Sequence, residues 1–296
     1  MKIKNIFLPA LAGLAIIAAP HTVHGGSDIM AELEDLTKKA TIELAVQVNL
    51  SGKQRMLTQK MSKEALLVAL GIDANDNRNN LKKTIALFDK TLIGLQKGDH
   101  SLGLVETINK DILDQLQRVA ALWQDFKPLV VSQANSDKKN KTTLEQIAIK
   151  NMPLLAAMNV AVGMYANISG ADTAELAVVI NLSGKQRMLT QKMTKEFLMI
   201  AHAIKVKENQ QALVNSISLF DKTLKGLLDG SKELGLPSTT DTKIRDQLVL
   251  VKKHWLAFSP LLQKPASDIS LRQVAKANLP LLSEMNKAVK MYELSW

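Results

Sequence analysis

The chain contains no cysteine, which excludes disulfide bonds, thiolate nucleophiles and thiolate metal sites. Only 8 of its 296 residues are proline, 14 are glycine and 4% are aromatic. Hydrophobic residues nevertheless make up 46% of the chain, so aliphatic side chains and methionine must fill the core. Such a composition is typical of helical proteins whose stability comes from packing. The sequence therefore predicts an all-α protein.

Long hydrophobic runs are scarce after the N-terminus. The first 25 residues carry Lys2 and Lys4, then an apolar run at residues 6–19, then small residues that end at Gly25. The run has about 14 residues, fewer than the roughly 20 that cross a bilayer, and the pattern is typical of a secretory signal. Because no later stretch approaches a membrane span, we expect residues 1–25 to be a cleaved signal peptide and the rest to be a soluble periplasmic protein. Retention of the segment as an N-terminal anchor is the alternative.

Basic residues outnumber acidic ones by 38 to 28, a formal net charge of +10. In an exported protein this excess favours an anionic ligand, an anionic envelope surface or an acidic partner. The lysines are dispersed and seldom interleaved with aromatic residues, so we expect no nucleic-acid binding. The histidines stand singly, and neither a nucleophile beside a base nor a glycine-rich phosphate loop is visible. We therefore expect no enzyme, no metal site and no cofactor.

A sequence of thirteen residues, Asn-Leu-Ser-Gly-Lys-Gln-Arg-Met-Leu-Thr-Gln-Lys-Met, occurs at 49–61 and again at 181–193. The offset is 132 residues (181 − 49) over most of the chain and 127 (292 − 165) near the end, where Tyr165 pairs with Tyr292. A unit of this length is one ordinary domain, so we expect two copies of one domain. The two expected domains are residues 26–168 and 172–296.

Apolar residues recur at helical spacing through each copy, interrupted by short polar breaks. Four amphipathic helices joined by short loops favour an antiparallel bundle, so the prediction is two tandem antiparallel four-helix bundles. The third helix is predicted to end before Pro128, and Pro153 to kink the fourth helix or mark its start. The recurring Asp89 and Asp221 are expected to pair with lysines on their own helices. The expected helices are 28–70, 78–96, 105–126 and 143–168 in the first copy, and 172–205, 208–229, 240–258 and 269–294 in the second.

The repeated motif places a narrow polar stripe on its helix. Ser51, Arg55 and Thr58 fall at i, i+4 and i+7, so they share one face. Gly52 lies beside this stripe and lowers helix propensity by about 1 kcal/mol relative to alanine, a cost that close approach of another backbone would offset. A guanidinium with hydroxyl groups one turn to either side is a set of donors suited to a small oxyanion. The corresponding residues of the second copy are Ser183, Gly184, Arg187 and Thr190.

Two interpretations of the motif arginines are open. If the two motif helices meet, Arg55 and Arg187 face one site from opposite sides, and an anion between them relieves their repulsion. Alternatively, each arginine is a solvated helix residue or pairs with Glu43 or Glu175. The polar residues of the motif are unchanged between copies that have drifted elsewhere, which favours the binding interpretation. Local gene conversion is the other cause of such identity.

The motif resembles the hallmark of the PilJ-type domain, the N-terminal sensor module of type IV pilus methyl-accepting chemotaxis transducers. That hallmark is similar to Asn-Leu-Ala-Gly-Arg-Gln-Arg-Met-Leu-Ser-Gln-Arg, and residues 49–60 and 181–192 match it closely. The family is related to the periplasmic bundles of nitrate/nitrite sensor kinases, in which one anion lies at a dimer interface between an arginine from each protomer. The resemblance implies that Arg55 and Arg187 form such a pair within one chain, with the tandem copy in place of the dimer mate.

These observations lead to two rival functions. The first is a periplasmic sensory protein that binds a small nitrate- or nitrite-like anion through the motif helices and presents the bound state to a membrane receptor or transporter. A homodimer is the other arrangement in which motif helices could meet. The rival is a non-enzymatic interaction or scaffold protein of the cell envelope, whose motif helices mediate self-association or docking. The two functions differ in whether an anion raises thermal stability.

Overall fold

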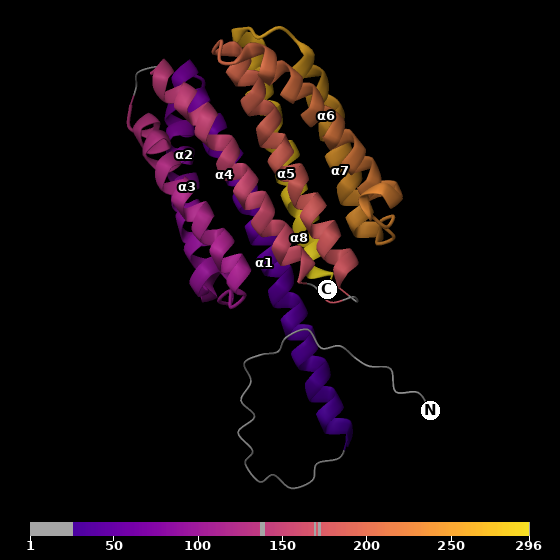
Figure 1. The fold of residues 1–296 in the computed structure, drawn as a ribbon. Coiled ribbons are helices and arrows are strands. Elements are labelled where there is room, and N and C mark those ends of the chain that lie inside the picture. The colour runs from indigo at the N-terminus through magenta and orange to yellow at the C-terminus, as the bar shows by residue number, and fades with distance from the viewer. Residues whose placement is uncertain (1–25, 137–139, 169, 171–172, 296) are drawn as a thin grey trace.

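The computed structural model describes residues 26–136, 140–168, 170 and 173–295 (Figure 1). The predicted signal peptide, residues 1–25, therefore lies outside the described residues. Within the described ranges the chain forms eight α-helices and three short 3-10 helices and has no β-strand. The prediction of an all-α tandem bundle is confirmed.

The helices fall into two sets of four that follow the internal repeat. Each set also contains a 3-10 turn between its second and third helix, and the second set has another after its third helix. The first set is α1 (Gly26–Leu70), α2 (Ala74–Lys97), η1 (His100–Leu102), α3 (Lys110–Ala134) and α4 (Lys141–Asn167). The second set is α5 (Ala174–Ala201), α6 (Val206–Asp229), η2 (Lys232–Leu234), α7 (Thr242–Phe258), η3 (Ser259–Gln263) and α8 (Asp268–Leu294).

Local side chains explain where several helices begin. Asn109, Asn140 and Asp241 each accept a hydrogen bond from the backbone N–H three residues further on, at 3.0–3.1 Å. Each contact satisfies one of the backbone donors that a helix N-terminus leaves unpaired. After α1, Gly71 takes a positive φ of 69°, a conformation that glycine adopts without strain. The first helix therefore stops sharply and α2 can return alongside it.

The two sets of helices pack side by side (Figure 1). In each set, the first and fourth helices lie inward, so α1, α4, α5 and α8 form the middle of the molecule. The α2–α3 pair lies outside on one flank and the α6–α7 pair on the other. Helices α1 and α5 run in the same direction and pack along each other. The two motif-bearing helices therefore meet within a single chain.

The prolines act differently in the two copies. In the first copy, α3 continues through Pro128 to Ala134, so the prediction that it ends before Pro128 is wrong. Burial of Val130 and Ala134 in the core stabilises the extra turns against the loss of one backbone hydrogen bond at the proline. In the second copy, α7 ends at Phe258 and the chain enters the 3-10 turn η3. Pro153 lies inside α4 and does not mark its start.

Helix α4 is, by length and composition, the one helix of the described chain apolar enough to cross a membrane. This finding corrects the expectation that no later stretch would approach a membrane span. In the fold, α4 packs against α1 and α3, and Leu154, Met158 and Val162 are fully buried in the core. A core helix of a bundle passes the same test of hydropathy.

Matching aromatic clusters anchor the outer helix pairs. The Phe88 and Trp123 ring centroids are 4.4 Å apart, and those of Phe220 and Trp255 are 4.2 Å apart. The Trp123 indole N–H donates to Asp89 at 2.7 Å, and Lys127 of α3 pairs with the same carboxylate at 2.7 Å. Asp221 likewise accepts from the Trp255 indole at 2.5 Å. The recurring aspartates therefore bind the neighbouring helix, and the prediction of pairing along their own helices is wrong.

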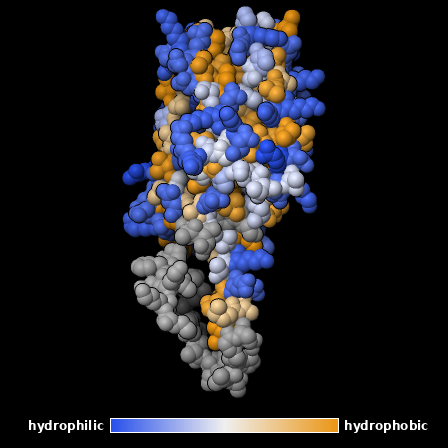
Figure 2. Space-filling model, turned by 90° about the vertical axis from the view of Figure 1, so that its right-hand side faces the viewer, coloured by the Kyte–Doolittle hydropathy of each residue, from blue (hydrophilic) through white to orange (hydrophobic). Residues whose placement is uncertain are grey.

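The N-terminal part of α1 stands clear of the bundle as a single projecting helix (Figure 1). Residues 29–40 are exposed along this stem. Figure 2, which faces the side of the second set of helices, shows polar side chains interspersed with apolar ones on the body above the stem. The buried part of α1 begins near Ala45, just before the motif. The motif is therefore positioned where α1 enters the middle of the molecule.

Candidate functional site

The two copies of the motif are buried against each other. Arg55 is 1% exposed and Arg187 is 3% exposed, so neither is a solvated helix residue. Their hydrogen bonds go to asparagines rather than to Glu43 or Glu175. The remaining predicted site residues lie at the same interface between α1 and α5. Ser51, Thr58, Ser183 and Thr190 are all fully buried.

Each arginine crosses to the motif helix of the other copy. Arg55 donates from Nη2 to the backbone oxygen of Asn181 at 2.9 Å, and from Nη1 to Asn159 Oδ1 on α4 at 2.9 Å. Arg187 donates from Nη2 to Asn49 Oδ1 at 2.7 Å and to the Asn49 backbone oxygen at 3.2 Å. Helical side chains lean toward the N-terminus of their helix. Each guanidinium therefore reaches the first residue of the opposite motif.

The two guanidinium groups lie close together between the motif glycines. A methyl group on Gly52 would be 3.4 Å from Arg55 Nη2 and 3.7 Å from Arg187 Nη2, and one on Gly184 would be 3.3 Å from Arg187 Nη2 and 3.6 Å from Arg55 Nη2. The two Nη2 atoms, each within 3.7 Å of both points, are thus within about 7 Å of each other. The glycines make room for guanidinium groups, whereas the sequence predicted close approach of a backbone.

Burial and like charge make this arrangement electrostatically unfavourable. Burial, and to a smaller extent the charge of Arg187, lower the pKa of Arg55 to about 9. Burial also lowers the pKa of Arg187 to about 10, while the carboxylate of Glu293 opposes that shift. Two unit charges no more than about 7 Å apart repel by at least about 2 kcal/mol at an effective dielectric constant of about 20. An anion at this position would relieve both effects.

Several buried polar atoms at the site have no hydrogen-bond partner among the residues that the structure describes. The Nε atoms of Arg55 and Arg187 are buried and have no hydrogen-bond acceptor among the described residues. Asn181 Oδ1 is also buried, and no donor from the described part of the chain reaches it. Most buried polar groups in native proteins are satisfied, so each exception calls for an explanation. A ligand between the arginines would supply acceptors for the two Nε donors.

The motif hydroxyl groups do not act as the sequence predicts. Ser51 donates to the Val48 backbone oxygen at 3.1 Å, and Thr58 to the Arg55 oxygen at 2.8 Å. The second copy repeats these contacts with small changes in register. The hydroxyl protons are therefore held by carbonyl groups of their own helices, and the donors that face the site are guanidinium groups. The small hydroxyl side chains permit close packing of α1 against α5.

A second pair of buried cations lies further along the motif helices, and the sequence analysis missed it. Lys63 donates to Asn278 Oδ1 on α8 at 3.1 Å, and Lys195 donates to Asn151 Oδ1 on α4 at 3.2 Å. Burial lowers the pKa of each lysine to about 8. Both asparagines precede Pro153 or Pro280 by two residues in a repeated Asn-x-Pro sequence. That repetition is the signal from which the asparagines could have been predicted.

Glu293 on α8 is a further residue that the sequence analysis missed. Its carboxylate accepts a short hydrogen bond from Asn49 Nδ2 and pairs with Lys290. Asn49 in turn accepts from Arg187, so the three residues form one connected group. The sequence signal was present, because Glu293 lies one residue after Tyr292 while its counterpart after Tyr165 is Ala166.

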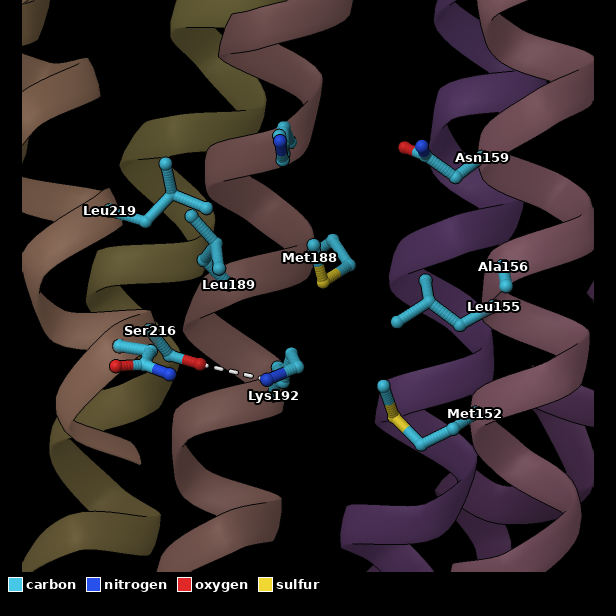
Figure 3. A pocket seen from close by; sticks show the side chains of 11 residues that line it. Met152, Leu155, Ala156, Asn159, Met188, Leu189, Lys192, Ser216 and Leu219 are labelled. Carbon is cyan, nitrogen blue, oxygen red and sulfur yellow. Dashed lines mark hydrogen bonds between the residues drawn. The ribbon is translucent and has the colours of Figure 1, made fainter. Parts of the chain in front are cut away.

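A groove of about 300 Å³ lies between α4 and the α5–α6 pair. Figure 3 shows Met152, Leu155 and Asn159 of α4 across from Met188 and Lys192 of α5. Lys192 donates to Ser216 of α6 at 2.9 Å on the groove wall. Asn159 is exposed and accepts from Arg55, so one residue of the groove wall is hydrogen-bonded to the buried arginine pair.

The described residues include no cluster of three or more histidine, aspartate or glutamate side chains that could hold a metal ion. The ion pairs Lys60–Glu64 and Lys192–Glu196 flank the buried lysines along the motif helices. The charged groups at the interface are thus arginines, lysines and a few paired carboxylates. This chemistry is suited to holding an anion.

Comparison with known proteins places these features in a family. The family described as "Type IV pili methyl-accepting chemotaxis transducer N-term", PilJ, matches residues 43–148 and again residues 173–278. Each match includes one motif helix and most of one helix set. A methyl-accepting chemotaxis protein from Pseudomonas aeruginosa, McpN, is 34% identical over 83 residues. That match covers 28% of this chain and 15% of the relative.

Proposed function

Because this chain belongs to the family of type IV pilus methyl-accepting chemotaxis transducer N-terminal domains, we propose that it is a periplasmic sensory protein that binds one small anion between Arg55 and Arg187. The family is one of sensory domains and not of enzymes. The proposal therefore includes no catalytic step. The predicted signal peptide, residues 1–25, is the feature that supports export.

One observation carries the proposal. Two guanidinium groups, 1% and 3% exposed, lie within about 7 Å of each other, and the Nε of each has no acceptor in the described residues. Buried charges are costly unless they are paired and hydrogen-bonded. The arginines come from helices of different copies, so a bound anion would neutralise a repulsion across the interface between the copies.

The dimensions of the site favour a ligand of a few atoms. The space between the arginines is bounded by Gly52 and Gly184, where an added methyl group would already lie 3.3–3.4 Å from the nearer guanidinium nitrogen. Planar or tetrahedral oxyanions match the fork of donors on a guanidinium. Nitrate and nitrite, the ligands of the sensor kinases that the motif resembles, have the right size and charge.

A ligand at this position could change the relation between the two helix sets. Anion binding would favour the arrangement in which α1 and α5 lie close together. In the anion-free protein, the charges of Arg55 and Arg187 would repel each other and oppose this arrangement. A ligand shifts such an equilibrium by its differential affinity for the two arrangements. A membrane receptor or transporter could then recognise the closed arrangement as the bound state.

The proposal is tested by thermal unfolding of residues 26–296 with nitrate, nitrite, sulfate, phosphate or acetate, at constant ionic strength set by chloride. We expect one class of anion to raise the melting temperature, since a ligand at 100 times its dissociation constant stabilises by about 2.7 kcal/mol. The rise should be lost in the double variant Arg55→Gln/Arg187→Gln. Arg272→Gln is the matched control, because Arg272 is half exposed and paired with Asp268.

A flat response to the whole panel would contradict the proposal and favour the rival function, an interaction or scaffold protein of the cell envelope. That rival requires a free surface on the motif helices. Their polar faces are buried within this chain, which makes the ligand-binding function the better supported of the two.

A further inference from the structure

The two halves of the arginine pair are built from equivalent residues but differ in one carboxylate. Each half consists of an arginine of one motif and the asparagine that opens the other motif. In one half, Arg187 donates to Asn49 Oδ1, and Asn49 donates from Nδ2 to Glu293. The amide of Asn49 therefore connects a buried cation with a buried anion. This half of the site already contains an oxyanion of its own.

In the other half, the described part of the chain provides no such group. Tyr165 and Tyr292 occupy equivalent positions, so the counterpart of Glu293 is Ala166. Arg55 donates to the backbone oxygen of Asn181, and Asn181 Oδ1 is buried without a donor from any described residue. Arg55 also contacts Asn159, which opens onto the groove between α4 and α5. This half is thus hydrogen-bonded to an exposed residue of the groove, and among the described residues it lacks a fixed negative charge.

The charges of the buried groups set the valence of a ligand. Arg55, Arg187 and Glu293 are 1%, 3% and 7% exposed, and together they carry a net charge of +1. A monovalent anion would leave this cluster neutral, whereas a divalent anion would leave it negative in a poorly hydrated site. The flanking Lys53 and Lys185 are only partly buried, and Lys290, which pairs with Glu293, is exposed, so water screens much of the charge of all three.

We infer that Glu293 is a tethered counter-anion, which occupies the Arg187 half of the site and restricts the chain to one monovalent oxyanion or carboxylate at the Arg55 half. This inference rests on the proposed anion-binding function and adds to it the stoichiometry, the charge class and the side of entry. Duplication within one chain permits this asymmetry, since a symmetric homodimer would carry either two such carboxylates or none.

Two substitutions test the inference in opposite directions. Glu293→Gln removes the counter-anion and raises the net charge of the cluster to +2, so affinity for sulfate should rise at least tenfold relative to nitrate. Ala166→Glu places a second carboxylate at the equivalent position beside Arg55. We expect it to abolish the response to every anion and to raise the melting temperature of the ligand-free protein, because it supplies the missing negative charge.

Matched controls separate charge from size and position. Ala166→Gln has the size of the glutamate without its charge and should retain a response to nitrate or acetate. Glu233→Gln removes a carboxylate that is exposed and far from the arginines in the sequence, where it pairs with Lys222, and should leave the ratio of nitrate to sulfate affinity unchanged. Isothermal titration calorimetry measures affinity and stoichiometry for all four variants, and circular dichroism verifies that each is folded.

The possible failures are distinguishable. If the parent protein responds to no anion, the proposed function fails and the inference falls with it. If the parent responds but Glu293→Gln keeps the same preference for nitrate over sulfate, Glu293 is no counter-anion and the inference alone is overturned. A parent stoichiometry of two anions per chain would overturn it equally. Should Ala166→Glu not fold, the Glu293→Gln titration decides by itself.

Discussion

Lys63 and Lys195 show how burial at this interface lowers the pKa of a single side chain. Each lysine is at most 4% exposed, and its amino group donates to a neutral asparagine oxygen on the opposite helix set. Glu64 and Glu196 favour the charged amines, and Lys60 and Lys192 oppose them. Burial is the largest influence, and it lowers the pKa of both lysines to about 8 from the usual 10.5.

We predict that the free energy of unfolding rises from about pH 8 to about pH 10.5. In this window the folded lysines have released their protons while the unfolded chain still holds them, so the unfolded state binds more protons and stability increases with pH. Below pH 8 both states are protonated and the cost of the buried charges is fully present. Urea unfolding at pH 7, 8, 9 and 10 measures the slope.

The variant Lys63→Met/Lys195→Met should flatten this slope and stabilise the protein at pH 7. The pKa change corresponds to a destabilisation of at most about 3 kcal/mol per lysine. We expect the free energy of unfolding of the double variant to exceed that of the parent by ~1–3 kcal/mol. Asn278 and Asn151 keep donors in Gln191 and Gln59, so the substitution leaves no acceptor unpaired. An unchanged slope in the double variant would assign the pH dependence to other groups.

At the scale of a helix, glycine is tolerated for different reasons in α1 and α4. Gly163 lies in α4 with no atom within 4 Å of the position that a β-carbon would take. At Gly52 in α1 the same position is 3.4 Å from Arg55 Nη2. Both residues lower helix propensity relative to alanine, but only Gly52 leaves space for a group of the site.

Gly163→Ala is therefore predicted to stabilise the protein by about 0.5–1 kcal/mol, because it improves helix propensity in open space. Gly52→Ala should give a smaller gain or none, since the added methyl group would be in contact with the guanidinium of Arg55, and it should reduce the anion-dependent rise in melting temperature. Thermal unfolding of both variants, with and without the best anion of the panel, makes the comparison. Equal behaviour of the two variants would show that the motif glycine has no role in the site.

At the scale of the whole molecule, the interface between the helix sets joins them into one body. Hydrogen bonds from Arg55, Lys63, Arg187 and Lys195 all cross this interface. Separation of the two helix sets would expose these cations and their asparagine partners to water. It would also expose the apolar residues packed between the two sets. We therefore expect both sets to unfold together.

The test uses the full chain with Trp255→Phe and Trp296→Phe, which leaves Trp123 as a fluorescent probe of the first helix set. Adding Leu248→Ala in the second set removes a fully buried side chain and should cost about 2–5 kcal/mol. The urea midpoint reported by Trp123 should fall accordingly. If it stays in place while the circular dichroism signal becomes biphasic, the two sets unfold independently and the interface contributes little.

The sequence by itself determined the all-α class, the two copies and the approximate bounds of the helices, because helical periodicity and an internal repeat are local properties of the chain. It also pointed to Arg55 and Arg187. Its errors were at contacts between elements, as for Pro128, where core burial overrides a local breaker, and for Asp89, which binds the indole of another helix.

Only the tertiary structure decided that the two motif helices meet within one chain. It also decided which groups surround the arginines, since Asn159 and Glu293 lie on α4 and α8, more than 100 residues from the arginines they approach directly or through Asn49. Whether residues so far apart in the sequence meet in space depends on how the four inner helices pack side by side and in what register. Packing of that kind is settled by the sum of many contacts across the interface, and no short stretch of sequence records it.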